Sequence, residues 1–174
     1  TSIVQNINKR KTSIILGDEE RVLFGPGYIV DTLSGINFKI SSKTFYQINH
    51  EQTEKLYSVV KEYANLTGDE TVLDAYCGVG TIGMTLASSS KKVIGVESNK
   101  QSVINARMNA SENKIKNISF VCDDATEYIQ KTADSFDVLI MDPPRSGSTD
   151  KFLSTINNKK IKRIVYVSCD AKTQ

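Results

Sequence analysis

The chain has 174 residues, of which 39% are hydrophobic and 24% are charged, a composition typical of a globular protein that buries one sizeable core. Its formal net charge of +2 is too small to indicate nucleic-acid binding by itself, and basic clusters at 9–11 and 159–163 add only weak support. No apolar run approaches the roughly 20 residues that a membrane-spanning helix needs, so we expect no contact with a membrane.

Short apolar runs at the start of the chain predict a small antiparallel β appendage in residues 1–48. The runs cover 13–16, 28–33 and 36–40, and glycine-containing turns separate them, as between strands. A helix is predicted to follow. Asn49 and Gln52 resemble a helix-capping pair, and apolar residues then recur at helical spacing. These apolar residues are Leu56, Val59, Val60 and Tyr63.

Strands and helices are predicted to alternate beyond Gly68. The predicted strands cover 71–76, 93–97, 118–122, 136–141 and 163–168. The predicted helices begin at Thr81 or cover 100–112, 125–131 and 151–156. This alternation is typical of a doubly wound, Rossmann-like α/β sheet, which we assign to residues 49–174 as the catalytic domain. Ligands of such sheets bind beyond the carboxyl ends of the strands.

The cysteines indicate the redox environment of the protein, and the ends of the chain indicate a truncated domain. Cys77, Cys122 and Cys169 form no CxxC pair and have no histidine at ligand spacing, which argues against a disulfide framework and against any metal site. A reducing cytoplasm is therefore expected. The chain begins at Thr1 and stops at Gln174 directly after an apolar run, so we expect a catalytic domain truncated at its C-terminus.

A glycine loop follows the strand predicted at 71–76. Residues 78–83 match the pattern GxGxxG, in which Gly78 and Gly80 let the backbone approach a ligand. Glu97 lies near the position of a ribose-binding acid, about 20 residues further along. This part of the pattern fits NAD as well as S-adenosylmethionine, because both carry that ribose.

Asp74 favours S-adenosylmethionine. It precedes the loop by four residues, where a carboxylate repels a pyrophosphate and attracts a cationic sulfonium ligand with an ammonium group. The alternative is a strand-end residue that caps the loop. Asp123 or Asp124, of which we select Asp124, can accept from the adenine amino group, and a helix N-cap explains either residue equally well.

Two further strand ends carry chemistry. Asp142-Pro143-Pro144-Arg145 is a stiff loop, since each proline fixes φ, and it has Arg145 where amine methyltransferases have an aromatic residue. Cys169 ends the last predicted strand. A thiolate there can add to a uracil ring, although a buried cysteine that only fills the core is the alternative. No chemical role is assigned to Cys77, Cys122 or His50.

Four motifs, in this order, resemble the RNA uracil-5-methyltransferase family over nearly the whole chain. They are Phe45 to Asn49, Asp74 to Thr81, Asp142 to Arg145 and Val167 to Asp170. The glycine loop and Asp-Pro-Pro-Arg are most similar to the bacterial 23S ribosomal RNA branch. The resemblance implies an RNA substrate, with ribosomal RNA favoured over transfer RNA, and 5-methyluridine as the product. We expect the protein to be a monomer.

The resemblance also implies roles for individual residues. The expected contacts to S-adenosylmethionine are Gln47, Tyr76, Thr81, Glu97 and Asp142. Cys169 is the implied nucleophile, Phe45 and Gln47 approach the target base, and we add Arg145 as a substrate contact. Asp170-Ala171 replaces the Asn-Pro that follows the cysteine in the family, which puts the local loop geometry in doubt. The family places its general base, a Glu, downstream of Gln174.

Two other functions stay open at this point. The first is an S-adenosylmethionine-dependent enzyme that methylates another base or an amine, although the two-cysteine pattern of cytosine-5 RNA enzymes is lacking. The second is a nucleotide- or RNA-binding module without catalysis, in which Cys169 is only a packing residue. Many members of the family have an RNA-binding barrel and an iron–sulfur region, and both are absent from these 174 residues.

Overall fold

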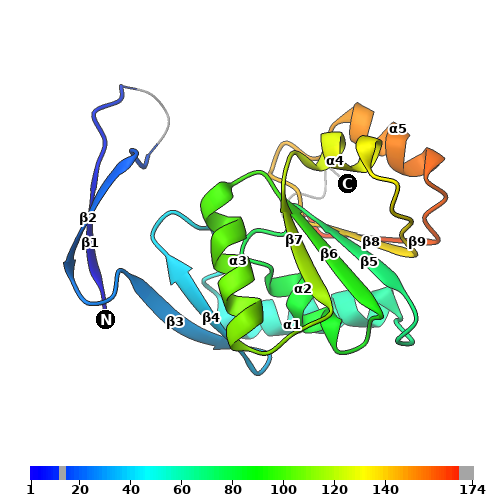
Figure 1. The fold of residues 1–174 in the computed structure, drawn as a ribbon, viewed down its shortest axis with the longest axis horizontal. Coiled ribbons are helices and arrows are strands. Elements are labelled where there is room, and N and C mark those ends of the chain that lie inside the picture. The colour runs from blue at the N-terminus through cyan, green and yellow to red at the C-terminus, as the bar shows by residue number, and fades with distance from the viewer. Residues whose placement is uncertain (12–14, 169–174) are drawn as a thin grey trace.

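A computed structural model of the chain describes residues 1–11 and 15–168 (Figure 1). Its centre is a parallel sheet of five strands in the order β7-β6-β5-β8-β9. The strands are β5 (Thr71–Ala75), β6 (Lys92–Glu97), β7 (Ile118–Cys122), β8 (Val138–Met141) and β9 (Arg163–Tyr166). This arrangement confirms the predicted α/β class, and each of these strands overlaps its predicted range.

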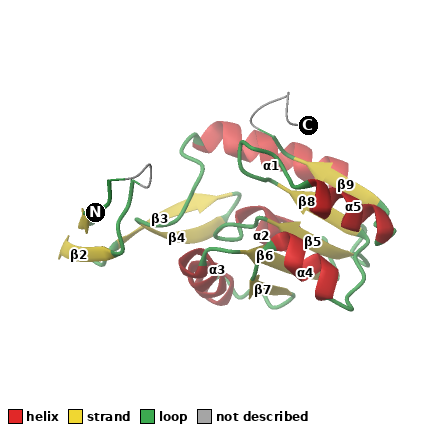
Figure 2. Ribbon diagram, turned by 90° about the horizontal axis from the view of Figure 1, so that it is seen from above, coloured by secondary structure: helices red, strands yellow, loops and turns green. Residues whose placement is uncertain are grey.

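Helices cover both faces of the sheet (Figure 2). They are α1 (His50–Ala64), α2 (Thr81–Ala87), α3 (Lys100–Glu112), α4 (Ala125–Lys131) and α5 (Asp150–Asn158). Alternate residues of each strand point to opposite faces, so Val72 of β5 packs in the core beneath α1, α2 and α3, whereas Leu73 packs in the core beneath α4 and α5. Two apolar layers therefore hold the sheet in place.

Two antiparallel hairpins precede the sheet and lie to one side of it (Figure 1). They pair β1 (Ile3–Ile7) with β2 (Glu19–Phe24) and β3 (Tyr28–Leu33) with β4 (Ile36–Ser41). The predicted appendage is confirmed, but one predicted strand is wrong. Ile15 and Leu16 lie outside any strand, and 12–14 lie outside the described residues. Strands β1 and β2 were not predicted, because neither has a fully buried residue and their polar residues, Gln5 and Asn6 in β1 and Glu19 to Arg21 in β2, interrupt any apolar alternation.

The predicted helix after the appendage is confirmed as α1. The side chain of Asn49 accepts a hydrogen bond from the backbone N–H of Gln52 at 3.2 Å and so caps the helix. The buried face differs in part from the apolar spacing, since Tyr57 and Ala64 are buried with Val60, whereas Tyr63 is 64% exposed. At its C-terminal end, the helix therefore buries Ala64 and leaves the neighbouring ring of Tyr63 exposed.

A ladder of asparagines joins the second hairpin to helix α3. The asparagines are Asn105, Asn109 and Asn113. The Asn109 amide accepts from the backbone N–H of Lys39 at 2.8 Å and donates to the same residue's carbonyl at 3.1 Å, and Asn113 pairs with Asn37 in the same way. Asn105 donates to Ser41 Oγ at 2.8 Å. Four helical residues rise about 6 Å and two strand residues about 6.6 Å, so side chains four apart on α3 have nearly the same spacing as residues two apart on β4. The asparagine amides therefore bond to β4 as a neighbouring strand would.

Phe38, Leu33 and Ile40 of the second hairpin share one apolar core with α1, α2 and α3. A domain boundary at residue 48 stays a prediction. Within residues 1–11 and 15–168, no helix is long and apolar enough to span a membrane.

Candidate functional site

The glycine loop lies at the carboxyl end of β5, where the sequence placed it. The N–H of Gly80 donates to the Cys77 carbonyl at 2.8 Å, and Gly80, with φ at 83°, is the N-cap of α2. Gly78 also has a positive φ, and a side chain there would meet no atom within 4 Å. Open space next to a backbone that only glycine adopts without strain leaves room for a ligand to approach the loop.

Asp74 is buried beneath this loop, with 1% of its surface exposed. Its Oδ2 atom accepts from the backbone N–H of Gly83 at 2.8 Å, and a Cβ on Gly83 would lie at the same distance from that oxygen. Burial raises the pKa of Asp74 to about 7, the Gly83 hydrogen bond opposes this rise, and the charges of Asp142 and Glu97 add to it. The loop-capping alternative thus has an observed partner, and the cofactor contact stays a prediction.

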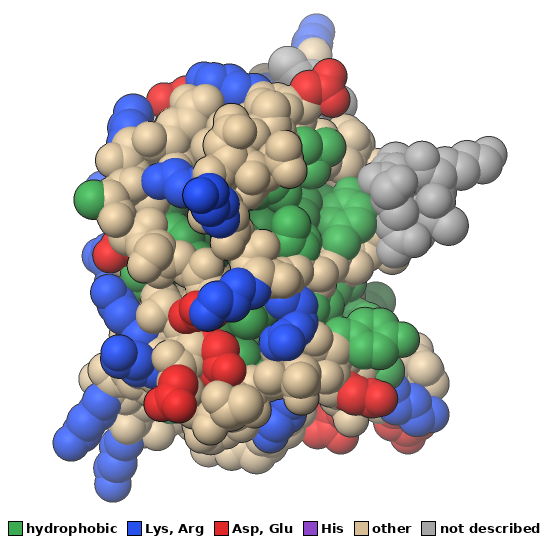
Figure 3. Space-filling model, turned by 90° about the vertical axis from the view of Figure 1, so that its right-hand side faces the viewer, with side chains coloured by type: hydrophobic (Ala, Val, Ile, Leu, Met, Phe, Trp, Pro, Cys, Tyr) green, Lys and Arg blue, Asp and Glu red, His purple; other side chains and the backbone are tan. Residues whose placement is uncertain are grey.

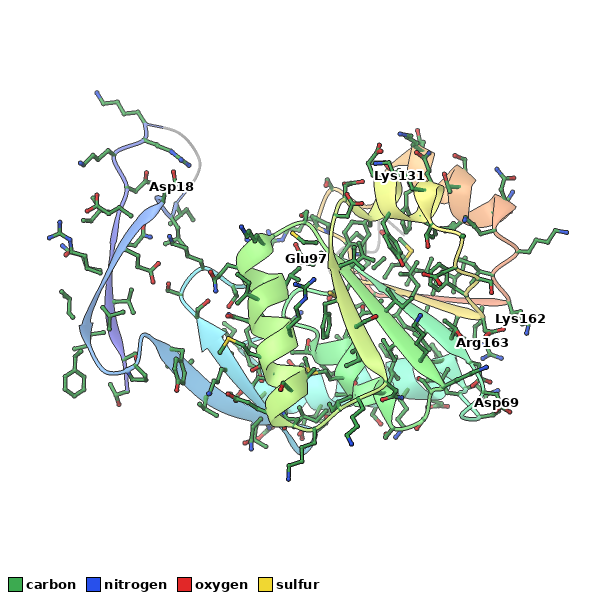
Figure 4. All side chains as sticks on the ribbon, viewed as in Figure 1. Asp18, Asp69, Glu97, Lys131, Lys162 and Arg163 are labelled. Atoms are coloured by element: carbon green, nitrogen blue, oxygen red, sulfur yellow. The ribbon has the colours of Figure 1, made fainter. Side chains whose placement is uncertain are left out.

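Glu97 joins the end of β6 to the glycine loop. Its Oε2 atom accepts from the N–H of Gly78 at 3.1 Å, and its Oε1 atom accepts from the N–H of Asn99 at 2.7 Å. Figure 4 places Glu97 at one edge of the sheet and Asp69, Lys162 and Arg163 at the opposite edge. The carboxylate is half-buried beside the loop, and its contact with a ribose stays a prediction.

Asp142 follows β8 and is half-buried, and this burial raises its pKa. The turn after it is closed by the N–H of Gly147, which donates to the Pro144 carbonyl at 2.8 Å, while Arg145 is exposed. Tyr76 ties the two loops together, because its hydroxyl lies 2.7 Å from Ser148 Oγ. The structure therefore brings the glycine loop and the Asp-Pro-Pro-Arg loop into contact.

Thr81 contacts helix α1. Its Oγ1 atom lies 2.6 Å from the hydroxyl of Tyr57, a buried side chain whose pKa is raised by desolvation. Phe45 and Gln47 lie in the segment between β4 and α1. Phe45 is 72% exposed and Gln47 is half-buried, and their expected contacts stay predictions.

Asp124 is the N-cap of α4. Its Oδ1 atom accepts from the N–H groups of Thr126 and Glu127 at 2.8 and 3.1 Å. The capping alternative is therefore seen in the structure, and the adenine contact stays a prediction. Cys77 is buried, which raises its thiol pKa, whereas Cys122 is exposed. Cys169 lies outside the described residues, but the N–H of Val167 donates to the Met141 carbonyl at 2.9 Å, next to Asp142.

Sequence reasoning missed three residues of this site. Tyr57 and Ser148 hold Thr81 and Tyr76, and Gly83 donates to Asp74. The third glycine of the GxGxxG pattern was a signal for Gly83, since a glycine inside a helix often marks a close approach. Tyr57 and Ser148 gave no signal, because their partners are 24 and 72 residues away along the chain.

The site brings together three carboxyl groups that have no cationic partner among the described residues. They are Asp74, Glu97 and Asp142, with which no described Lys, Arg or His forms an ion pair. Buried carboxylates without a cationic partner are costly, and a bound cation lowers that cost. The arrangement suits a cationic ligand with a ribose and opposes a pyrophosphate.

Comparisons with solved structures first define the class. The fold is similar to that of an S-adenosylmethionine-dependent methyltransferase of Agrobacterium tumefaciens, with a TM-score of 0.66 and 18% identity. That alignment covers 88% of this chain and 57% of the other. The chain has the fold of this class of methyltransferases.

A family model described as tRNA (Uracil-5-)-methyltransferase matches residues 9–174, and the chain belongs to that family. It is 47% identical to an uncharacterised RNA methyltransferase of Halalkalibacterium halodurans and 48% identical to one of Staphylococcus aureus strain N315. These alignments cover 99% and 100% of this chain but only 38% and 39% of the relatives, so the chain spans about two-fifths of their length.

A solved structure of the family is also similar to the chain. It is the Pyrococcus abyssi tRNA (uracil-54, C5)-methyltransferase in complex with S-adenosyl-L-homocysteine, with a TM-score of 0.84 and 33% identity. The alignment covers 99% of this chain and 42% of that one. The hairpins before the sheet are thus included in the shared structure.

Proposed function

We propose that the protein containing this chain transfers a methyl group from S-adenosylmethionine to C5 of a uridine in RNA. The observation that carries this proposal is the set of three carboxylates, Asp74, Glu97 and Asp142, around an open glycine loop with no cationic partner among the described residues. In a member of the uracil-5-methyltransferase family, a cationic methyl donor is the ligand that matches this charge.

The described residues fit S-adenosylmethionine. Glu97 offers two carboxylate oxygens to the ribose hydroxyls, and Asp74 and Asp142 stabilise the positive charge of the ligand. Gln47, Tyr76, Thr81 and Asp124 complete the proposed contacts. When bound, S-adenosylmethionine supplies an electrophilic methyl group. A molecule of the same class, S-adenosyl-L-homocysteine, is bound in the Pyrococcus abyssi structure.

Cys169 is proposed as the nucleophile. C5 of uracil is a poor nucleophile by itself. When the Cys169 thiolate adds to C6, the electron pair of the C5–C6 double bond moves to form an enolate, and this enolate can accept the methyl group at C5. A base then removes the C5 proton, the double bond re-forms, and the C6–sulfur bond breaks to release the thiolate. Phe45 and Arg145 are exposed, which suits the proposed contacts to RNA.

We propose ribosomal RNA as the substrate, in preference to transfer RNA. The support is the glycine loop and the Asp142-Pro143-Pro144-Arg145 loop, which are similar to the bacterial ribosomal branch. The name of the Pyrococcus abyssi protein points the other way, to transfer RNA. We also propose a monomer in the cytoplasm, where the exposed thiol of Cys122 stays reduced.

Covalent trapping tests the reaction and the substrate together. The whole protein is incubated with S-adenosylmethionine and with 23S ribosomal RNA or transfer RNA in which 5-fluorouridine replaces uridine. Fluorine at C5 prevents the last proton removal, so the thioether should survive denaturation. We expect an adduct with ribosomal RNA that requires the methyl donor, and the crosslinked nucleotide identifies the target.

The matched control compares two cysteines. Cys169→Ala should lose the adduct completely, and Cys122→Ala, which removes the exposed thiol at the end of β7, should keep it. An adduct that survives in Cys169→Ala, or none in a protein that binds both RNA and the methyl donor, overturns the thiolate mechanism. Methylation of an amine or a non-catalytic module would then take its place. An adduct with transfer RNA alone overturns only the choice of substrate.

A further inference from the structure

A cavity lies beside helices α1 and α2, toward the amino edge of the sheet, and Tyr57 stands between it and Thr81 of the candidate site. It has a volume of about 620 Å³, within the range of cavities that hold small ligands. Its walls come from the β3–β4 turn, helix α1, the second half of α2 and the loop between α3 and β7. Because α2 ends and β7 begins there, the cavity belongs to the amino edge of the sheet, whereas the glycine loop belongs to the carboxyl edge.

The cavity is lined by three lysines and one acid. Lys61, Lys114 and Lys116 form no ion pair with any described residue. The acid, Glu54, is already engaged, since its Oε1 atom accepts from the N–H of Ser34 at 2.8 Å. Three cations with one engaged carboxylate make the cavity attractive to an anion.

Side-chain hydrogen bonds fix the walls relative to one another. Asn117 donates to the carbonyls of Ala87 and Ser90 at 2.7 and 2.9 Å, which joins the α3–β7 loop to the end of α2 and satisfies carbonyls that would otherwise repel an anion. Asn113 joins the same loop to β4 through Asn37. The backbone that carries Lys114 and Lys116 is therefore held in place before any ligand binds.

The lining is also polar between the lysines. Hydroxyl groups that can bond to phosphate or sugar oxygens come from Ser34, Ser58, Thr85 and Ser88. The face seen in Figure 3 differs from this cavity, since Lys and Arg side chains there are interspersed with Asp and Glu. An excess of positive charge, hydroxyl groups and a hollow shape occur together in the cavity.

We propose that this cavity binds the phosphodiester backbone of the RNA substrate at a place remote from the target uridine. RNA as the partner rests on the proposed function. A folded RNA that reaches the carboxyl edge with its target nucleotide can extend past the hairpins to the amino edge, where the three lysines neutralise its phosphates. The contact increases the affinity for RNA without favouring any nucleotide sequence, because phosphates carry no sequence information.

The test removes the three charges in the whole protein. The variant Lys61→Gln, Lys114→Gln, Lys116→Gln is compared with Lys55→Gln, Lys131→Gln, Lys151→Gln, which removes three exposed lysines elsewhere. Binding of full-length transfer RNA and of a 23S ribosomal RNA fragment is measured between 50 and 300 mM KCl. We expect the first variant to bind about tenfold more weakly. The slope of log K against the logarithm of the salt concentration should also be shallower by about two to three. A short stem-loop that carries the target nucleotide alone should bind both variants equally, since it does not reach both edges.

The outcomes separate this proposal from the proposed function. An unchanged RNA affinity and salt dependence in the first variant overturns the phosphate site and would assign the cavity to another class of partner, such as an acidic protein. An equal loss in both variants also overturns it, because the effect is then net charge alone. In methylation assays KM for RNA should rise while kcat stays unchanged. If the wild type methylates neither RNA but the binding loss is specific, the function is wrong and the phosphate site stands.

Discussion

The two edges of the central sheet handle charge in opposite ways. At the carboxyl edge Asp74, Glu97 and Asp142 are buried or half-buried, and within the described residues none has a cationic partner. At the amino edge exposed or half-buried basic residues lie before, or at the start of, three of the strands. They are Lys91, Lys92, Lys114, Lys116, Lys160, Lys162 and Arg163. Most of them need no partner because water screens them.

The difference shows which charged groups affect the stability of the folded protein. The exposed pair of Lys162 and Asp137, at 2.8 Å, belongs to the class of ion pairs that contributes little to stability. The buried carboxylates raise the free energy of the folded protein, and a bound cation recovers that energy as affinity. A chain with a net charge of +2 can thus present an anionic ligand site and a cationic one.

Gly83→Ala should have the largest effect. Its new Cβ would lie 2.8 Å from Asp74 Oδ2 and 3.2 Å from side-chain atoms of Ile118 and Val93, in a layer with no room to move. We expect a loss of about 2–4 kcal/mol in the free energy of unfolding, measured by urea denaturation.

Gly35→Ala is the matched control at the amino edge. Gly35 has φ at 77°, but a Cβ there meets nothing within 4 Å, so only backbone strain of about 1 kcal/mol is expected. Equal losses in the two variants would show that the Gly83 contact with Asp74 does not limit the space at the carboxyl edge.

Asp74→Asn should weaken S-adenosylmethionine binding by about 30-fold at pH 8, because the amide keeps the Gly83 hydrogen bond but removes the negative charge. Isothermal titration of the whole protein measures the affinity. Asp137→Asn, which removes a carboxylate at the amino edge, should leave it unchanged. If Asp74→Asn binds as tightly as the wild type, Asp74 only caps the loop.

The pH dependence of stability should reveal the buried carboxyl. With its pKa at about 7 instead of 3.8, folded Asp74 holds a proton that the unfolded chain has released between these values. Stability therefore falls as pH rises through this range. From pH 6 to pH 8 the wild type should lose about 1 kcal/mol more than Asp74→Asn, measured by thermal unfolding without ligand. Parallel curves for the two proteins would contradict the raised pKa.

Lys162→Gln should have the smallest effect. The side chain of Lys162 is 77% exposed, and its loss leaves Asp137 in contact with water and with the N–H of Thr71. We expect little or no change in Tm at physiological salt. A clear loss of stability would show that the amino edge stores electrostatic energy as the carboxyl edge does.

The sequence predicts the sheet well and the first hairpin poorly. Strands β5 to β8 are apolar runs bounded by turn residues, so their pattern is visible without knowledge of neighbours. The hairpin of β1 and β2 is solvent-exposed and carries Glu19, Glu20 and Arg21 in its second strand, so no apolar alternation marks it.

The same limit applies to the candidate site. The strand-end rule predicts that Asp74, Glu97 and Asp142 lie at one edge, because it needs only the order of strands and helices. The hydrogen bonds of Tyr57 with Thr81 and of Tyr76 with Ser148 could not be predicted, since they join segments whose approach is set by packing. The roles of Gln47, Arg145 and Cys169 stay predictions.

The asparagine ladder between α3 and β4 separates two kinds of opening motion. The N–H groups of Asn37 and Lys39 donate to side chains of Asn113 and Asn109, not to the partner strand β3. Hydrogen exchange at these two amides therefore reports the hairpin detaching from the helix, even while β3 and β4 remain paired. Their partners lie 76 and 70 residues away in sequence, so protection at these two amides requires that α3 has formed and has packed against β4.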